Sequence, residues 1–573
     1  MNRIIWKWNV EINFMVGGEA GQGVQSVGFL LAKAMVRWGY HVFADQDYES
    51  RVRGGHNFFR IRAGNAPVAA IRESVDILIA LNKESIDLHR HELAKGGVII
   101  YDGEKLTGLA GNDLINVPFT NLAKEEAGDA VMANTVALGA ALGLIGYDVN
   151  LLNELLTGFF SGESGAKNVK AANAGYQQAQ KFEGAQKILA RAGDDKRMLL
   201  NGNEAMAIGA IAAGCKFMAA YPMTPITSIM EYLAAHSAEF GLVVVPAEDE
   251  IAAMNMTVGA SFTGVRAMTA TSGGGFCLMV EGLGLAAMTE TPVVVIEGTR
   301  PGPAIGLPTR TEQGDLDFIL HASHGEFPRV VFAPATVEDC FNLTVQAFNI
   351  AEKYQLPVLL ITDHYMANSY FTADKFDPGK VVIDRGLLFD KNKAAGGTYK
   401  RYAYTESGIS PRVFPGNKDA LVVADSDEHD EAGHLIEDAE TRTKMMEKRF
   451  KKLDALKKEV VPHRFYGADS ADTLLIGWGS TYGVIKESAE TMNQTGGSCS
   501  HLHLSQVWPF PIEAVSNAMK KAKHTHVIEN NFTGQLAGLI REQTGLAATG
   551  SILKYDGRPF TPEIILAELR KQR

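Results

Sequence analysis

Residues 267–297 have the sequence AMTATSGGGFCLMVEGLGLAAMTETPVVVIE, which has the pattern of one strand–helix–strand unit. Two short apolar runs, Ala267–Thr271 and Pro292–Glu297, have the length of buried strands. The apolar segment between them is long enough for a helix that returns the chain to the same edge of a sheet. This stretch therefore predicts two neighbouring parallel strands of an α/β fold.

Similar apolar runs occur on both sides of this unit, and helical patterns fall between most of them. They lie at Lys216–Ala220, Leu242–Pro246, Arg329–Phe332 and Pro357–Thr362. Six strands that alternate with helices predict a doubly wound sheet.

The rest of the chain has two further α/β blocks. In the first block, residues 1–190, apolar runs and a glycine loop predict an alternating domain with a parallel sheet. Its strands are expected at Ile12–Val16, His41–Ala44, Ile77–Ala80 and Val98–Tyr101. The last block is expected to have strands at Leu474–Gly477, Ser500–Leu504 and His526–Glu529.

We therefore expect an α/β chain with three doubly wound domains, 1–190, 191–375 and 466–573. Residues 376–465 hold turn-rich loops, an acidic segment and a basic helix. We interpret them as a linking arm, although an ordinary solvated surface helix has the same composition.

Composition excludes several classes of protein. The chain has 573 residues, of which 46% are hydrophobic, and a formal net charge of −11, which disfavours nucleic acid as a partner. Its longest apolar runs fall far short of the ~20 residues of a membrane span, and the N-terminus lacks the pattern of a signal peptide.

Four cysteines lie far apart, without a CxxC pair, at Cys215, Cys277, Cys340 and Cys499. We expect reduced, buried thiols in a cytoplasmic protein and no four-cysteine iron–sulfur cluster formed by this chain alone.

The first block carries a glycine loop, GGEAGQG at residues 17–23, between a strand and a helix. Glycines such as Gly21 and Gly23 let backbone N–H groups approach an anion at a helix N-terminus. A tight turn with close packing is the alternative. Ser26 replaces the third glycine of a dinucleotide fingerprint, which counts against a nicotinamide-binding domain.

A second glycine pair follows in the segment RVRGGH. Arg51, Arg53 and His56 surround Gly54 and Gly55, and such a basic group can hold a phosphate or a carboxylate. An exposed loop with ordinary surface arginines explains the same pattern equally well.

In the second block, YPMTP follows an expected strand. Two prolines, one of them Pro222, stiffen this loop between Tyr221 and the next helix. The hydroxyl of Thr224 is then presented at the carboxyl end of the sheet, where α/β folds bind ligands. A plain N-cap role for Thr224 is equally compatible.

An acidic segment, EDEIAA, begins a helix of small apolar residues. Acids in a first turn normally complement the helix dipole, but an acid packed against Ala252 and Ala253 would be desolvated. The run Thr271–Gly275, which includes Gly273 and Gly274, forms another close-approach loop. Arg300 ends the next strand and suits carboxylate binding; Arg310 is its competitor, and a surface ion pair is the alternative for both.

Taken together and in this order, these motifs resemble the 2-oxoacid:ferredoxin oxidoreductases. The resemblance rests on GGEAGQG, RGGH, YPMTP, EDEIAA, TSGGG, GLPTRTEQGDL, WPFP and ENNFTGQ, and it spans nearly the whole chain. It implies a γ domain fused ahead of an α subunit, a pyrimidine-binding domain for thiamine diphosphate, and a transketolase-C-like domain.

The implied reaction is the oxidative decarboxylation of a 2-oxoacid with coenzyme A and ferredoxin. The γ–α fusion and GLPTRTEQGDL lean toward 2-oxoglutarate; pyruvate, branched-chain and arylpyruvate 2-oxoacids are the alternatives.

The resemblance also implies residue roles. Glu250 would bond the aminopyrimidine ring of the cofactor, Thr224 would contact the keto-acid end of the substrate, and Arg300 would grip its carboxylate. Arg53 would reach the distal carboxylate of 2-oxoglutarate. The further cofactor contacts are Tyr221, Pro222, Gly273 and Gly274, and the coenzyme A candidates are Gly21, Gly23, Arg51, Gly54, Gly55 and His56.

Neither a GDG…N segment nor a cysteine cluster occurs in the chain. The resemblance therefore implies an obligate β subunit that carries Mg²⁺ and a [4Fe–4S] cluster, in an α₂β₂ assembly that reduces ferredoxin. A catalytically silent scaffold is the alternative from another class, and it predicts the loss of Thr224, Glu250 or Arg300, all of which are present.

Overall fold

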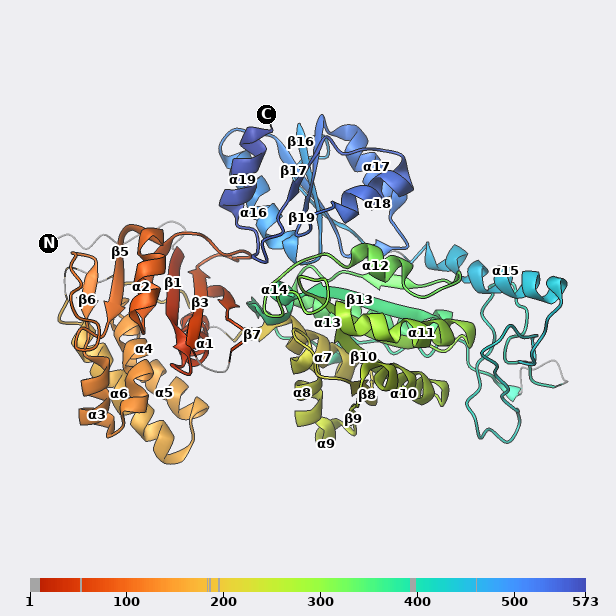
Figure 1. Cartoon of the computed structure of the whole chain (residues 1–573), viewed down its shortest axis with the longest axis horizontal. Helices are drawn as coiled ribbons and strands as arrows, with labels where there is room; N and C mark the ends of the chain where they lie inside the picture. Colours follow the sequence, from red (N-terminus) through yellow and green to blue (C-terminus); the bar gives the residue numbers. More distant parts are fainter. Residues whose placement is uncertain are drawn as a thin grey trace. The chain divides into compact units, whose positions relative to one another are not determined.

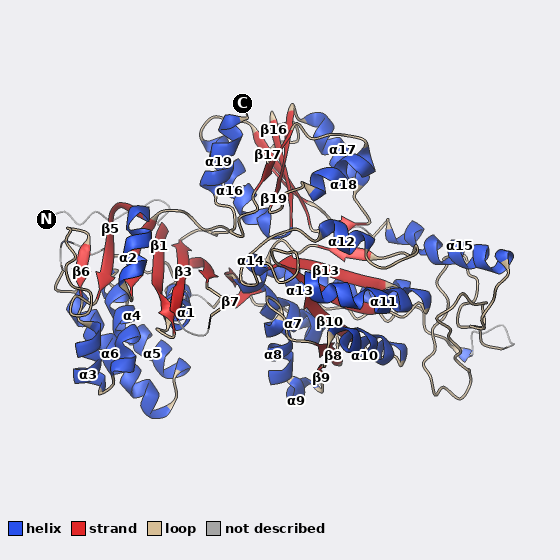
Figure 2. Ribbon diagram, in the orientation of Figure 1, coloured by secondary structure: helices blue, strands red, loops and turns tan. Residues whose placement is uncertain are grey.

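The structure is a computed structural model, shown in Figure 1 and, by secondary structure, in Figure 2. It describes residues 11–51, 54–182, 184, 187–193, 196–391, 398–459 and 461–572. The chain divides into two compact units. Unit 1 comprises Met1–Leu200, Ser369–Lys375 and Thr561–Ile564, and unit 2 comprises Asn201–Asn368, Phe376–Phe560 and Ile565–Arg573.

Unit 1 is built on a mixed sheet. Its order is β6 (Leu114–Asn116), β5 (Leu93–Tyr101), β4 (Val75–Ala80), β1 (Glu11–Ala20), β3 (Gly54–Gly64), β2 (His41–Asp47), β14 (Tyr370–Ala373) and β7 (Met198–Asn201). The expected parallel pairing holds for β1, β4, β5 and β6. The pairs β1–β3, β2–β3 and β2–β14 are antiparallel instead. The connection between β2 and β3 is too short for a crossover helix, so these strands must form a hairpin.

Helices cover this sheet and pack closely on one another (Figure 2). They are α1 (Val24–Arg37), α2 (Lys83–His89), α3 (Phe119–Ala127), α4 (Ala133–Leu144), α5 (Val149–Phe159) and α6 (Gly162–Ala179). A Cβ atom at Gly139 of α4 would lie 2.0 Å from the Ala172 carbonyl of α6. A Cβ atom at Gly175 of α6 would lie equally close to the Val136 carbonyl. Glycine at both positions therefore lets the two backbones touch.

The central sheet of unit 2 is parallel except at one edge. Its order is β18 (Gln506–Trp508), β12 (Val330–Phe332), β13 (Pro357–Asp363), β11 (Val293–Thr299), β10 (Ala267–Ser272), β8 (Phe217–Ala220) and β9 (Val243–Pro246). The ends of the six parallel strands lie within two residues of the ends expected from the sequence. Apolar runs marked these strands. Five of them are largely buried because both faces of the sheet are covered there, whereas β9 is partly exposed.

The helices of this region alternate with the strands. They are α7 (Gly202–Ala212), α8 (Thr227–Ala235), α9 (Ser237–Phe240), α10 (Glu250–Phe262), α11 (Gly273–Met288), α12 (Leu316–His321), α13 (Val337–Tyr354) and α14 (His364–Asn368). The α10 helix begins with a side-chain cap, because Asp249 accepts a hydrogen bond from the Ala252 amide at 2.7 Å.

The third sheet also belongs to unit 2. Its order is β15 (Arg464–Tyr466), β17 (Cys499–Leu504), β16 (Thr473–Trp478), β19 (His524–Glu529) and β20 (Gly550–Leu553). The helices α16 (Tyr482–Gln494), α17 (Ile512–Lys521), α18 (Gln535–Thr544) and α19 (Pro562–Lys571) follow its strands. Because β18 pairs with β12, the last block of sequence completes the central sheet. The expected α/β architecture with three sheets is confirmed, and the domain boundaries at 190, 375 and 465 stay predictions.

The basic helix of the expected arm is α15 (Ala439–Leu456). It is not simply solvated, because Lys448 and Lys452 are buried against the buried carboxylate of Glu290. Burial by itself would raise the pKa of Glu290, but the two lysines and Arg401 lower it below its usual range. These buried ion pairs therefore attach helix α15 of the arm to Glu290, which lies two residues after the end of helix α11.

Three cysteines, Cys215, Cys340 and Cys499, are buried as expected, but Cys277 is exposed on α11. The expectation of a buried thiol is therefore wrong for Cys277, which lies on the outer side of a helix whose apolar composition hid its orientation. No helix in the described part of the chain combines the length and apolar character that a membrane crossing requires.

Candidate active site

The predicted site residues of unit 2 follow neighbouring strands of the central sheet. The loop with Thr224 follows β8, Glu250 begins the helix after β9, Gly273 follows β10, and Arg300 follows β11. The carboxyl ends of parallel strands meet at one edge, where open α/β sheets bind ligands. The fold therefore brings these four segments to the same side of the sheet, where its parallel strands have their carboxyl ends.

Glu250 is a buried acid with an uncompensated oxygen. Its residue is 4% exposed, and no group in the described part of the chain hydrogen-bonds its Oε1 atom. A Cβ atom at Gly275 would lie only 2.5 Å from that oxygen, so a residue larger than glycine would displace the carboxylate. A buried carboxylate without a donor is unfavourable unless a ligand supplies one. The expectation of a desolvated acid in this helix agrees with this position.

The glycines of the TSGGG turn have different neighbours. A Cβ atom at Gly273 would lie 2.3 Å from Oδ2 of Asp315, whereas Gly274 is exposed and meets only the Ala304 carbonyl, at 3.6 Å. Gly275, which belongs to the expected close-approach loop but was not predicted as a cofactor contact, is the one that faces Glu250.

Side chains of other residues hold the YPMTP loop by hydrogen bonds to its backbone carbonyl groups. The Arg300 guanidinium donates through Nη1 to the Thr224 carbonyl at 2.9 Å. The Asn203 amide donates to the Pro225 carbonyl at 2.8 Å. The alternative role of Thr224 as a helix N-cap is wrong, because α8 begins at Thr227 and its cap residue is Ile226. Tyr221 and Pro222 are exposed.

Arg300 and Arg310 both act on the same buried histidine. Burial, together with the positive charges of Arg310 and then Arg300, lowers the pKa of His364 to about 3. His364 is therefore neutral at physiological pH. The two arginines that compete for a substrate carboxylate thus lie in one electrostatic neighbourhood.

The sequence did not reveal three further acids beside these loops: the buried Glu297 on β11, the half-buried Asp315 before α12, and the buried Asp363 at the end of β13. Burial raises the pKa of Asp363 to about 6, against hydrogen bonds from Ser480 and the Met366 amide. The available signal was an acid at the end of a strand that is otherwise apolar, as in VVVIE.

The candidates of unit 1 lie on the glycine loop and after β2. Gly21 and Gly54 have positive φ angles of 95° and 74°, and a Cβ atom at either would meet nothing within 4 Å. At Gly23, which caps α1, a Cβ atom would lie 2.1 Å from the Asn134 amide nitrogen. These contacts agree with an exposed turn at Gly21 and a close approach at Gly23.

The basic residues near Gly55 have partners within unit 1. Arg51 is exposed and forms an ion pair with Glu49 at 2.9 Å, and the same carboxylate lies 2.5 Å from a Cβ atom placed at Gly55. His56 meets His89, with 2.7 Å between their Nε2 atoms. Arg53 lies outside the described residues.

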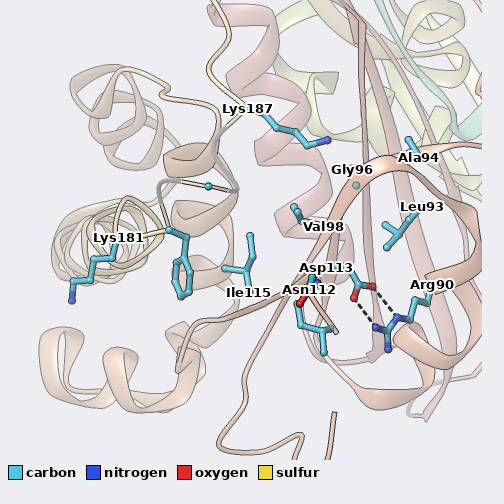
Figure 3. A pocket seen from close by; sticks show the side chains of 14 residues that line it. Arg90, Leu93, Ala94, Gly96, Val98, Asn112, Asp113, Ile115, Lys181 and Lys187 are labelled. Atoms are coloured by element: carbon cyan, nitrogen blue, oxygen red, sulfur yellow. Dashed lines mark hydrogen bonds and ion pairs between the residues drawn. The ribbon is translucent and has the colours of Figure 1, made fainter. Parts of the chain in front are cut away.

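A separate hollow of about 1010 Å³ lies at the β5–β6 edge of unit 1 (Figure 3). None of its lining residues was predicted from the sequence as part of a functional site. Its Arg90 is bound through two nitrogens to Asp113, at 2.8 and 2.6 Å, and its Lys187 lies 3.5 Å from Asp76. These cations are already compensated within the unit.

Comparison with protein families gives three matches along the chain. Residues 208–448 match "Pyruvate flavodoxin/ferredoxin oxidoreductase, thiamine diP-bdg". Residues 13–178 match "Pyruvate ferredoxin/flavodoxin oxidoreductase", and residues 471–565 match "Pyruvate:ferredoxin oxidoreductase core domain II".

Curated relatives extend this likeness over the full length. The chain is 33% identical to the 2-oxoacid:ferredoxin oxidoreductase subunit alpha of Sulfolobus sp, over 96% of this chain and 95% of the relative. The chain belongs to the 2-oxoacid:ferredoxin oxidoreductase family. It is also 37% identical to the 2-oxoglutarate synthase subunit KorA of Archaeoglobus fulgidus, over 64% of this chain and 96% of that subunit.

A solved structure of this oxidoreductase family has the same fold. It is the 2-oxoglutarate:ferredoxin oxidoreductase from Magnetococcus marinus, with a TM-score of 0.91 and 32% identity over 98% of this chain and 99% of that one. The family expected from the motifs is confirmed, as is membership of an oxidoreductase class. The thiamine-binding match includes Thr224, Glu250 and Arg300.

Proposed function

We propose that this chain is the α subunit of a 2-oxoglutarate:ferredoxin oxidoreductase. The enzyme would interconvert 2-oxoglutarate, coenzyme A and oxidised ferredoxin with succinyl-CoA, CO₂ and reduced ferredoxin. The observation that carries the proposal is Glu250, a buried carboxylate beside a glycine turn whose Oε1 atom has no donor among the described residues.

The residues at this edge fit thiamine diphosphate. Glu250 offers an acceptor to a ring nitrogen, and the bare backbone at Gly274 allows close approach. The other proposed cofactor contacts are Tyr221, Pro222, Thr224 and Gly273. When bound, the cofactor supplies the carbanion chemistry, while the protein supplies position and electrostatics. The task of Glu250 is to hold and release a proton at its free oxygen.

The substrate carboxylate would be held by Arg300. Its bond to the Thr224 carbonyl fixes the guanidinium beside the YPMTP loop, and Arg310 is the alternative. Arg53 would contact the distal carboxylate. Support for 2-oxoglutarate comes from relatives: the Archaeoglobus subunit is named a 2-oxoglutarate synthase, and the Magnetococcus structure has 2-oxoglutarate, coenzyme A and succinyl-CoA bound.

The coenzyme A contacts proposed in unit 1 are the glycine loop with Gly21 and Gly23, and the segment Arg51, Gly54, Gly55 and His56. The open Cβ sides of Gly21 and Gly54 support close approach of a ligand. Arg51 is the weakest member of this set, because Glu49 already neutralises it.

A partner subunit is part of the proposal. Helices α10 and α11 pack together, and both expose apolar side chains: Ile251, Met256 and Leu278 are 50%, 43% and 49% exposed. Ile251 follows Glu250 directly in the sequence. We propose that a β subunit that carries Mg²⁺ and the [4Fe–4S] cluster covers these apolar side chains. We propose an α₂β₂ assembly with ferredoxin as the electron acceptor and a location in the cytoplasm.

The test is anaerobic co-expression of the chain with its β subunit, followed by reduction of viologen or ferredoxin with coenzyme A. Reduction with 2-oxoglutarate but not pyruvate would support the substrate. Reduction with pyruvate, a branched-chain or an arylpyruvate 2-oxoacid would support the reaction of the family but contradict 2-oxoglutarate as the substrate. A complex that holds thiamine diphosphate and the cluster yet reduces with no 2-oxoacid would contradict the proposal and favour a silent scaffold.

A further inference from the structure

Two acids flank the glycine turn after β10 from opposite ends. Glu250 faces Gly275, and Asp315 faces Gly273, since Cβ atoms at these glycines would lie 2.5 and 2.3 Å from the respective carboxylate oxygens. The turn is thus seated between two carboxyl groups. Asp315 therefore contacts the same turn that Glu250 contacts, at its other end.

Asp315 has a second carboxyl group behind it. Glu297 is fully buried on β11; its Oε2 accepts from the Thr299 hydroxyl at 3.0 Å, and its Oε1 has no donor among the described residues. The side chain that it meets there is the carboxyl group of Asp315. A hydrogen bond between two carboxyl groups needs one shared proton. Among the described residues, no lysine, arginine or histidine forms an ion pair with either acid, so this proton takes the place of a cation.

The proton belongs mainly to Glu297. Burial and then the charge of Asp315 raise the pKa of Glu297 well above its usual range. Burial also raises the pKa of Asp315, but the hydrogen bond from Glu297 opposes that rise. Asp315 therefore carries the negative charge. It lies against the first residue of α11, where the helix dipole favours an anion.

The surroundings of the pair hold other titratable groups. The groups that interact with it from neighbouring elements are Asp363 of β13, Glu312 of the preceding loop and Cys277 of α11. All three would add negative charge on ionisation. Loss of the shared proton would therefore be opposed on every side.

We propose that Glu297 and Asp315 are a positioning pair that seats the Gly273–Gly275 turn against Glu250 by sharing one proton. Neither acid is a catalytic residue, because the pair acts through the turn. The effect on cofactor binding rests on the proposed function, whereas the shared proton does not.

The first test measures thiamine diphosphate binding to the α–β complex across pH. In the wild type, affinity should fall as pH rises and the pair gives up its proton. Glu297→Gln keeps a permanent donor and should make affinity independent of pH in that range. Glu297→Leu removes the donor and should weaken binding ~10-fold or more at every pH. Wild-type affinity and pH dependence in Glu297→Leu would overturn the positioning role.

The second test needs no cofactor. The folded pair retains a proton that unfolded carboxyls release above ~pH 4, so this pair lowers the unfolding free energy as pH rises from there to its folded pKa. Denaturant unfolding of the full chain should show a shallower fall for Glu297→Gln than for the wild type. Glu326→Gln, the same change at an exposed loop residue, is the control and should keep the wild-type slope.

The two tests separate the two proposals. A complex that binds no thiamine diphosphate, with the expected change of slope in Glu297→Gln, would refute the proposed function and retain the shared proton. Equal slopes for the wild type and Glu297→Gln would refute the shared proton, whatever the cofactor does.

Discussion

Two buried glutamates lie near opposite ends of helix α11 and differ in their electrostatic partners. Glu250, next to its first turn, has an oxygen that no described group bonds. Glu290, two residues after its end, is 1% exposed; Lys448 bonds its Oε1 at 2.6 Å and Lys452 is its second cation. Both carboxyl groups are buried, but of the two only Glu290 forms ion pairs with described residues.

The difference separates a structural charge from a functional one. Removing one partner of a buried ion pair leaves the others uncompensated, so Glu290 contributes to the attachment of the arm helix α15. An acid buried without a partner adds nothing comparable to folding, and such groups concentrate at binding and catalytic sites. The comparison predicts opposite phenotypes for the two residues.

Glu250→Ala should lower turnover by ~10²–10⁴-fold, because it removes acid–base assistance. It should leave the unfolding free energy within ~1 kcal/mol of wild type, since no internal bond to Oε1 is lost. Viologen reduction by the α–β complex and denaturant unfolding of the chain measure the two effects. Turnover within about threefold of wild type would be incompatible with the proton-holding role.

Glu290→Ala should lower the unfolding free energy by ~3–5 kcal/mol, because Lys448, Lys452 and Arg401 lose their counter-charge. Urea unfolding measures this change, with Glu326→Ala, at an exposed position, as the control. A loss no larger than that of the control would mean that the cluster does not stabilise the arm. Turnover of the folded fraction should remain near wild type.

Arg300→Ala should reduce kcat/KM for the 2-oxoacid by ~10-fold or more, as expected when a charged hydrogen bond to a carboxylate is lost. Arg310→Ala is the matched variant, because both arginines act on His364. A larger loss for Arg310→Ala, with Arg300→Ala near wild type, would transfer the carboxylate contact to Arg310.

The smallest predicted effect concerns how the unfolding free energy depends on pH through Lys452, one of the lysines that pair with Glu290. Burial lowers the pKa of Lys452 to about 7, so the unfolded chain binds more protons than the folded chain between pH 7 and ~10.4. This residue should therefore raise the unfolding free energy as pH increases through that window. Lys452→Met should show less of this rise. An unchanged pH profile in Lys452→Met would contradict a lowered pKa for Lys452.

Five of the six parallel strands in the central sheet of unit 2 were predictable because a strand covered on both faces must be apolar along its whole length. The sixth, β9, is an apolar run although it is partly exposed. The YPMTP, EDEIAA and TSGGG segments were predictable because each directly follows one of these apolar strands. The pairing in unit 1 was not. Strand β14, far along the sequence, joins β2 there, and the β2–β3 hairpin turns an expected parallel sheet into a mixed one.

The sequence by itself determined the strand–helix alternation and the order of the loops at the carboxyl end of the sheet. It left three acids open in EDEIAA, and only the family resemblance singled out Glu250. Only the tertiary structure decided which buried charges are compensated. Glu290 meets Lys448 across 158 positions, Glu297 meets Asp315 from another loop, and Glu250 has no donor for Oε1 in the described chain. Hydrophobic periodicity is a local property of the chain, whereas the partner of a charge depends on which distant segments the fold brings within a few ångströms.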